Sequence, residues 1–473
     1  MTATVKGEPR TGATYRPGGG WDEASHPDGR PRDGYASLMD ALQGVDLSRL
    51  DEDVSARLAD AGVTFGGAPS TFRVDPVPRI FGAEEWAGIE AGVAQRARAL
   101  AAFVCDVYAD RAIVQAGRVP AHAIESAEHF EPWMVGVAMP STGFVAGLDL
   151  VRGHDGHLRV LEDNTRTPSG LAYLLAARAA VDAHLPVAPP AARREPAAAY
   201  EMLGEMLRAA APDGVSDPYV GLLSDGPANN AWWEHRQVAR ALGIHLVTPS
   251  SLLVRRGRLH AVADSGKTYP IDVLYRRTDE DRLRGPNGRA TWLADLLLAP
   301  VRRGNLTVVN PFGAGVADDK LIHAYVGEMV RFYLGEEPLL RSVHTYDLGD
   351  PEVRKSVMPR LDELVVKPRS GLGGYGVVVC PHASEADRRE VVRRANAAPH
   401  AWVAQEMVAL STHPTVCDGR LEPRHVDLRP YAMGGATHAT TVPGALTRVA
   451  FDRGSLVVNS SQNGGAKDTW GLA

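Results

Sequence analysis

A run of glycines near the C-terminal end of the chain joins one apolar strand to another. Lys367 ends the apolar stretch ELVVK, and Gly371, Gly373, Gly374 and Gly376 separate it from the apolar stretch VVV. A Rossmann fingerprint or a Walker loop must instead run into a helix, whose N-terminus binds the phosphate. The run therefore matches neither fold. Its backbone N–H groups can still bind phosphates beside the Lys367 charge, and the alternative is a mobile hairpin tip with a surface lysine.

The composition is that of an ordinary globular protein. Of 473 residues, 44% are hydrophobic and 23% are charged, which allows a core of normal size, and the length suggests about three domains. The net charge of -6 argues against a nucleic-acid partner. No apolar run approaches the roughly 20 residues that cross a bilayer, and no secretory signal is recognisable. Three scattered cysteines argue against a disulfide scaffold, so we expect a cytoplasmic protein without a membrane partner.

Hydrophobic periodicity divides the chain into four parts. Residues 1–35 are rich in Gly and Pro and lack an apolar pattern, which predicts a flexible N-terminal arm. Residues 36–200 combine amphipathic helices with a β-hairpin, and residues 201–310 alternate strand and helix as a parallel βαβ unit does. Residues 311–473 contain a predicted helix at 318–335, the glycine run and further strands. The predicted class is α/β or α+β with several lobes.

Two carboxylates are expected to face each other across a hairpin. Asp149 and Glu162 lie equally far from the dipeptide Asp155-Gly156, which is typical of hairpin turns. Directly opposed side chains share one face about 5 Å apart, and Asn164 follows on the same face. Neighbouring carboxylates repel unless a hard cation such as Mg²⁺ binds them. The alternative is that both are solvated and pair with nearby arginines, and a bulge would change the register.

A second lysine and a strand end are weaker candidates for ligand contacts. Lys320 could act beside Lys367 on a phosphate, or it could be a solvated helix residue. Gln405 and Glu406 end an apolar strand, where an adenine edge and a ribose could meet them. On physical grounds alone, an ordinary strand end is the preferred interpretation of that pair.

Arginines and a polar run complete the candidates. Arg429 and Arg448 suit bidentate binding of a carboxylate or phosphate, and Arg277 ends a strand. Residues 459–469 are polar but not highly charged and precede Trp470, which suggests an ordered polar loop. Its candidate substrate-binding residues are Asn459, Ser460, Ser461 and Lys467.

Several long motifs, in one order, resemble the circularly permuted ATP-grasp family, which includes glutathionylspermidine-synthase-like proteins and is similar to glutathione-synthetase-type ligases. They include GLDLVRGHDGHLRVLEDNTRTPSG, VLYRRTDEDRL, VVKPRSGLGGYGVVV, RHVDLRPY and LTRVAFDRGSLVVNSSQNGGAKDTW. The resemblance covers most of the chain. It implies a circularly permuted ATP-grasp fold with an inserted parallel βαβ substrate domain.

The resemblance also implies roles for individual residues. Mg²⁺, with Mn²⁺ as an alternative, would bind to Asp149, Glu162 and Asn164. ATP would contact Lys320, Lys367, the lid-loop residues Gly371, Gly373, Gly374, Tyr375 and Gly376, and the adenine-pocket residues Gln405 and Glu406. Arg277 and Arg448 would bind the substrate, and the expected catalytic residues are Arg277, Arg429, Arg448 and Lys367.

The function implied is an ATP-dependent carboxylate–amine ligase. ATP would phosphorylate a substrate carboxylate, and an amine would then displace phosphate from the acylphosphate to form an amide. The expected partners are a small-molecule or peptide acid and an amine, and a homo-oligomer or partner protein is left open. Two alternatives remain: an ATP-grasp phosphotransferase that acts on a hydroxyl, and a non-catalytic nucleotide-binding subunit of a larger assembly.

Overall fold

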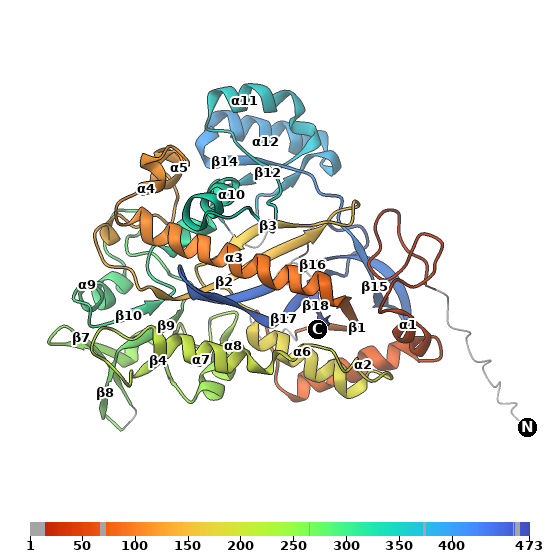
Figure 1. Ribbon diagram of the computed structural model, residues 1–473, viewed down its shortest axis with the longest axis horizontal. Coiled ribbons are helices and arrows are strands. Elements are labelled where there is room, and N and C mark those ends of the chain that lie inside the picture. Colours follow the sequence, from red (N-terminus) through yellow and green to blue (C-terminus); the bar gives the residue numbers. More distant parts are fainter. Residues whose placement is uncertain (1–14, 67–71, 264, 372–374, 457, 459–463) are drawn as a thin grey trace, which may run out of the picture.

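A computed structural model describes residues 15–66, 72–263, 265–371, 375–456, 458 and 464–473. The fold is mixed α/β, as predicted, and contains several separate sheets. Figure 1 shows a large central sheet, a parallel unit beside it and a small sheet above it.

The central sheet contains both the carboxylate hairpin and the C-terminal strands. Its order is β1-β18-β17-β16-β2-β3, and β15 pairs with β16. β1 and β18 are parallel, and the other pairs are antiparallel. The bounds are β1 (Val74–Phe81), β2 (Thr142–Arg152), β3 (Leu158–Asn164), β15 (Thr412–Cys417), β16 (Arg420–Gly435), β17 (Ala439–Ala450) and β18 (Gly464–Gly471).

Helices cover both faces of this sheet. The alanine-rich helix α3 (Ala83–Val107) packs on β16 and β17, and α6 (Leu171–His184) packs on β17 and β18. Figure 1 shows α3 along one side of the sheet and α6, with α2 (Leu47–Asp60) and α7 (Ala199–Ala209), along the other. Each face therefore has its own buried apolar core.

The predicted parallel βαβ unit is confirmed. β4 (Val220–Ser224) pairs in parallel with β5 (His245–Val247) and β9 (Val273–Arg277), and β9 pairs in parallel with β10 (Thr307–Val309). The crossover helix α8 (Trp232–Leu242) ends at Gly243, whose φ of +63° suits glycine. A side sheet consists of β6 (Leu252–Arg255), β7 (Arg258–Val262) and β8 (Thr268–Ile271).

The glycine run lies in a small antiparallel sheet, between two strands as predicted. The order is β11-β14-β12-β13, and the run connects β12 to β13. The strands are β11 (Thr345–Asp347), β12 (Leu364–Pro368), β13 (Val378–Val379) and β14 (Trp402–Glu406). Helices α11 (Pro351–Val357) and α12 (Glu385–Ala397) lie on this lobe (Figure 1). Shorter helices elsewhere are α1 (Ala36–Leu42), α4 (Ala112–Gln115), α5 (Ala121–Glu125), α9 (Ala299–Arg302) and α10 (Val326–Met329).

The described part of the predicted flexible arm is packed against the protein. Residues 15–35 contact β15, where Glu23 N donates to Thr412 O at 2.9 Å. Glu23 is 7% exposed and pairs with Arg79 at 2.6 Å. This segment is therefore packed along the edge of the central sheet, because its charged side chains form buried ion pairs with residues far away in the sequence.

Two other local predictions are wrong. Residues 318–335 do not form one helix: short 3₁₀ segments at Ala314–Asp318 and Ile322–Tyr325 precede α10, and a π-helical turn follows. The side chain of Asp319 accepts a hydrogen bond from Leu321 N and pairs with a buried arginine, which holds the turn between those segments. Residues 464–469 belong to β18 rather than to a polar loop.

Candidate active site

A cavity of about 400 Å³ opens between the β2–β3 hairpin and the small sheet. The hairpin, the segment around Lys320, the small sheet and the centre of β16 and β17 all line it. Predicted site residues on its wall are Asp149, Glu162, Asn164, Lys320, Lys367, Gly371, Tyr375, Gln405, Glu406, Arg429 and Arg448. The fold thus brings together residues that lie up to about 300 positions apart.

The opposition of the two carboxylates is confirmed. Asp149 pairs directly with Glu162, and Asn164 pairs with Gly147 two positions further on. The Asp149 side chain is 4% exposed, whereas that of Glu162 is 30% exposed. The pairs nearer the turn, such as Leu150 with Val160, are offset by one position, and a bulge between them and Asp149 brings Asp149 opposite Glu162. Asn164 carries a buried amide nitrogen without a hydrogen-bond partner among the described residues.

Asp149 is held by both candidate arginines. Arg429 donates two hydrogen bonds to it at 2.7 and 2.9 Å, and Arg448 Nη2 lies 2.9 Å from Asp149 Oδ2. Arg448 also binds Asp427 through Nε at 2.9 Å. Burial alone would raise the pKa of Asp149, but Arg429 and Arg448 hold it at about 2. Asp149 is therefore a carboxylate anchored between two cations.

The two lysines converge on the cavity, which the sequence alone could not establish. Lys320 Nζ lies 3.2 Å from Glu162 Oε1 and donates to Gly371 O at 2.9 Å. Lys367 Nζ donates to Gln405 Oε1 at 2.6 Å. Burial lowers the pKa of Lys367 to about 8. The cavity therefore has two cationic side chains and the first residue of the glycine run at one place.

The end of β14 and the residues after it form the other part of the wall. Gln405 Nε2 donates to Thr345 Oγ1 at 2.9 Å, so this amide is fixed between β11 and Lys367. Glu406 accepts a hydrogen bond from the Tyr346 hydroxyl at 2.6 Å. Apolar side chains lie beside this strand end and form a surface that a flat ring could cover; they are Leu161, Val365, Val379, Met407 and Val408.

The donor set fits a nucleotide with a hard cation. Mg²⁺ usually takes one or two carboxylates and completes its shell with water and substrate phosphates. Glu162 is partly open and offers a carboxylate oxygen, whereas the unpartnered buried atom of Asn164 is its amide nitrogen, which donates hydrogen bonds and does not ligate a cation. Asp149 fits less directly, because both of its oxygens accept from arginines. Among the described residues, no three His, Cys, Asp or Glu side chains cluster into a metal site made by protein alone.

Some predicted site residues lie elsewhere or outside the described residues. Lys467 is fully buried in β18, where it pairs with Asp75 and donates to Pro414 O at 3.0 Å. Lys467 does not line the cavity, because its ammonium group is paired with the buried carboxylate of Asp75. Gly376, the last glycine of the run, does not line the cavity. The predicted contacts of Gly373, Gly374, Asn459, Ser460 and Ser461 fall outside the described residues.

Arg277 supports the cavity wall from behind. It is 4% exposed, donates to Pro168 O at 2.7 Å and lies 3.3 Å from Glu234. Glu234 also accepts from Gly170 N at 2.9 Å, so both side chains hold the loop that contains Pro168 and Ser169. That loop lines the cavity, whereas Arg277 itself does not. The structure thus places Arg277 as a positioning residue rather than in the predicted substrate contact.

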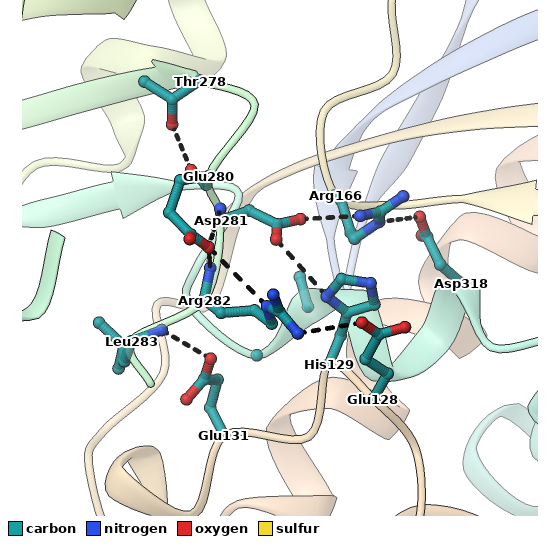
Figure 2. A network of polar contacts seen from close by, with 12 residues as sticks. Glu128, His129, Glu131, Arg166, Thr278, Glu280, Asp281, Arg282, Leu283 and Asp318 are labelled. Atoms are coloured by element: carbon teal, nitrogen blue, oxygen red, sulfur yellow. Dashed lines mark hydrogen bonds and ion pairs between the residues drawn. The ribbon is translucent and has the colours of Figure 1, made fainter. Parts of the chain in front are cut away.

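A polar network that sequence reasoning missed borders the cavity opposite the small sheet. Arg166 Nε donates to Asp318 at 2.9 Å and Arg166 Nη1 to Asp281 at 3.1 Å. His129 Nδ1 lies 3.5 Å from Asp281. Figure 2 shows these four side chains converging from four separate segments. His129 and Asp318, the residues of this network that lie furthest apart, are 189 positions apart, so no local sequence pattern could have identified the network.

Comparison with known families decides the classification. A family model described as circularly permuted ATP-grasp type 2 matches residues 78–450. The chain belongs to this family. The predicted resemblance is therefore confirmed, and the matched region includes the hairpin, both lysines, the glycine run and β16.

Similar proteins occur in several bacteria. A Frankia alni protein named "Putative glutamate--cysteine ligase 2-3" is 44% identical over 470 residues, which are 96% of this chain and 54% of that protein. "Uncharacterized protein sll0335" of Synechocystis is 39% identical over 97% of this chain and 98% of its own length. The chain spans about half the length of the two Frankia relatives it matches.

A solved structure supports the fold alone. The apo form of a glutathione synthetase-like effector from Globodera pallida matches with a TM-score of 0.58 and 12% identity, over 90% of this chain and 96% of that chain. Separately, none of the helices in the described residues combines the length and apolar character that a membrane crossing requires.

Proposed function

We propose that the chain is an ATP-dependent carboxylate–amine ligase that forms an amide through an acylphosphate. The observation that carries the proposal is the convergence of Lys320, Lys367 and Glu162 on one cavity with an apolar end. Cations, an oxygen ligand and an apolar surface are the three features that a Mg²⁺–nucleotide needs. Membership in the ATP-grasp family supports the same chemistry.

Each group has a place in this proposal. Lys320 and Lys367 would contact phosphate oxygens, and Glu162 with Asn164 would ligate Mg²⁺. When bound, Mg²⁺ supplies charge that neutralises the phosphates. The apolar surface beside Glu406 would take the adenine ring, so that the phosphates extend toward the hairpin. Arg429 and Arg448 would keep Asp149 ionised and in place beside the metal ligands.

The reaction needs no protein nucleophile. A carboxylate oxygen of the acid attacks the γ-phosphorus, and the bond to the bridging oxygen breaks and releases ADP. The amine then attacks the acyl carbon, the bond to the phosphate oxygen breaks, and phosphate leaves while the amine nitrogen loses a proton. Lys320, which already bonds Gly371, would draw the glycine run over the phosphates and exclude water that would hydrolyse the acylphosphate.

The substrates in the names of the relatives are not assigned to this chain. The name of the Frankia alni protein specifies glutamate and cysteine, but this chain matches just over half of that protein. The named activity can therefore belong to the unmatched half. The proposal for this chain is limited to a carboxylate acid and an amine.

Nucleotide turnover with mass-spectrometric product detection tests the proposal. The full chain, Mg²⁺ and ATP are offered pooled amino acids, short peptides and polyamines. We expect ADP, phosphate and a new condensation mass, all absent with Glu162→Gln and retained with Glu385→Gln, a control at a carboxylate on α12 that is 73% exposed. A mass equal to an acceptor plus a phosphoryl group would establish a phosphotransferase instead. ATP binding without turnover in any pool would favour the non-catalytic subunit.

A further inference from the structure

A second, smaller cavity adjoins the candidate active site. It has a volume of about 220 Å³, below the range of roughly 300–1,000 Å³ typical of pockets for drug-sized ligands. Glu128 lines both cavities, and Glu131, Arg282 and Arg284 line the smaller one. The turn at Gly285–Gly288 closes one side. A ligand in this space would therefore be small and next to the proposed reaction centre.

Two side chains of opposite charge on its wall each carry one buried atom that has no hydrogen-bond partner among the described residues. Glu131 is 3% exposed; its Oε1 accepts from Leu283 N at 2.7 Å, whereas Oε2 is buried without a hydrogen-bond partner among the described residues. In Figure 2 a single dashed line reaches this carboxylate. Arg284 Nε is likewise buried, and nothing in the described chain accepts from it. Buried polar groups are normally satisfied, so each of these needs an explanation.

The remaining charges on the wall neutralise each other. Arg282 donates to Glu128 at 3.0 Å and lies 3.8 Å from Glu280 (Figure 2). Burial raises the pKa of Glu131 to about 7, even though the charge of Arg284 acts to lower it. Arg284 thus attracts Glu131 but forms no ion pair with it in the described structure. The cavity wall thus carries one unpaired carboxylate oxygen, Glu131 Oε2, and one unpaired guanidinium nitrogen, Arg284 Nε, among the described residues.

We infer that this cavity is the subsite for the amine substrate and that it binds a small α-amino acid as the zwitterion. The ammonium group would contact Glu131 and the carboxylate would contact Arg284, which satisfies both orphaned groups at once. A polyamine would leave Arg284 unpaired, and a simple acid would leave Glu131 unpaired. The assignment of the ligand as the amine partner rests on the proposed function, whereas the binding of a zwitterion does not.

The wall shared by the two cavities provides the connection that such a subsite needs. His129 and Asp318 line the large cavity, and Asp281 with Arg166 links them through contacts of 3.5, 3.1 and 2.9 Å. Glu128 precedes His129 and borders both spaces. The two cavities therefore meet at Glu128.

Ligand-observed saturation-transfer NMR on the full chain, without nucleotide, tests the subsite. The probes are glycine, L-alanine, L-serine, L-threonine and L-cysteine, with ethylamine and propionate as single-charge comparisons. We expect at least one amino acid to bind, and Glu131→Gln and Arg284→Gln each to weaken it at least tenfold. Glutamine at position 131 can still accept from Leu283 N, and circular dichroism verifies folding. Arg289→Gln removes an exposed cation from the same turn and should bind as the wild type does.

Two results would overturn the inference. One is that no amino acid gives saturation transfer with the wild-type chain, which would mean that water satisfies the two groups. The other is that an amino acid binds but neither Glu131→Gln nor Arg284→Gln weakens its binding, or that ethylamine or propionate binds as tightly as the amino acid does. Hydroxylamine trapping on the wild-type chain separates this from the proposed function: a hydroxamate without amino-acid binding refutes the subsite alone, and charge-dependent binding without ATP turnover or hydroxamate refutes the ligase alone.

Discussion

The charged residues of the candidate site already satisfy one another at the level of single side chains. Asp149 binds Arg429 and Arg448, and Glu162 binds Lys320. The two carboxylates differ in environment, because Asp149 is almost fully buried and Glu162 is partly open. A polyphosphate would therefore exchange partners most easily with Lys320 and Glu162, whereas Asp149 serves first as the counter-charge of the arginines.

Removal of the buried anion should destabilise the protein more than removal of the open one. Asp149→Ala leaves Arg429 and Arg448 without their shared partner, and breaking a buried pair costs about 3–5 kcal/mol. Glu162→Gln should lower the free energy of unfolding by less than this, because the Glu162–Lys320 pair is partly open to solvent. Urea denaturation measures both. Equal losses of unfolding free energy in the two variants would contradict the proposal that Asp149 is a structural anchor and Glu162 a metal ligand.

Nucleotide binding should weaken at alkaline pH because of Lys367. Burial lowers the pKa of this ammonium to about 8, and a bound polyphosphate would raise it again. Above pH 8 the free protein has lost the proton that the complex retains, so binding takes up a proton and affinity falls by about tenfold per pH unit.

Calorimetry with a non-hydrolysable ATP analogue between pH 7.5 and 9.5 measures this dependence. Lys367→Met should bind weakly at every pH and lose the slope. Lys355→Met, at an exposed position on α11, should retain the wild-type slope. A wild-type affinity that does not change over this range would show that Lys367 does not contact the phosphates.

At the scale of elements, the hairpin and the glycine run were predictable and β18 was not. The turn at Asp155-Gly156 follows from local chemistry, whereas the opposition of Asp149 and Glu162 also requires the bulge beside Asp149, which the sequence does not show. Lys467 looked like a loop residue because its partner Asp75 lies 392 positions earlier. The sequence likewise predicted that Arg277 contacts the substrate, but its guanidinium instead donates to the carbonyl oxygen of Pro168, 109 positions away. These predictions were wrong because each side chain pairs with a residue far away in the sequence, and the same is true of the N-terminal segment.

The conformation of the glycine run should matter for nucleotide affinity. Gly371 has a φ of +105° and an added Cβ would contact none of the described residues, so Gly371→Ala introduces backbone strain of about 1–2 kcal/mol and no clash with them. We expect a roughly tenfold weaker Kd, since 1.4 kcal/mol corresponds to tenfold. Gly214→Ala is the matched control, because φ is +81° and its Cβ is equally free in a turn away from the cavity. An equal loss of affinity in both variants would rule out a specific role for the run.

The N-terminal segment should stabilise the central sheet in a pH-dependent way. Burial opposes ionisation of Glu23, but Arg79 and Arg152 lower its pKa to about 2 from 4.5. A depressed carboxyl pKa gives stability that is present above pH 4.5 and lost as pH falls through 2, here about 3 kcal/mol.

Glu23→Gln should therefore lower the free energy of unfolding at pH 7, and its deficit should shrink below pH 4.5. Urea titrations at a series of pH values compare it with Glu52→Gln, a control at a side chain that is 72% exposed on α2. A deficit that stays constant down to the acid unfolding range would indicate a packing defect rather than a lost charge.

The whole molecule is organised around the cavity rather than around one domain. The central hairpin, the small sheet and the segment between them each supply part of its wall. Arg277 and Glu234 connect the parallel unit to the loop that forms another part. A ligand that fills this space contacts elements whose own cores are separate, so its binding energy is shared between them.

Mg²⁺ with a non-hydrolysable ATP analogue should therefore stabilise the chain as a unit. A ligand at 100 times its Kd adds about 2.7 kcal/mol to the native state. We expect a higher Tm, with hydrogen-exchange protection that appears together in β3, in β12 and β14, and around Lys320. Chelation of the metal should reduce the shift, because the Glu162 carboxylate would then face the phosphates without a cation between them. The double variant Lys320→Met/Lys367→Met should lose the shift while it retains the fold. Protection confined to the small sheet would mean that the nucleotide binds there without engaging the hairpin, and the proposed metal ligands would then be wrong.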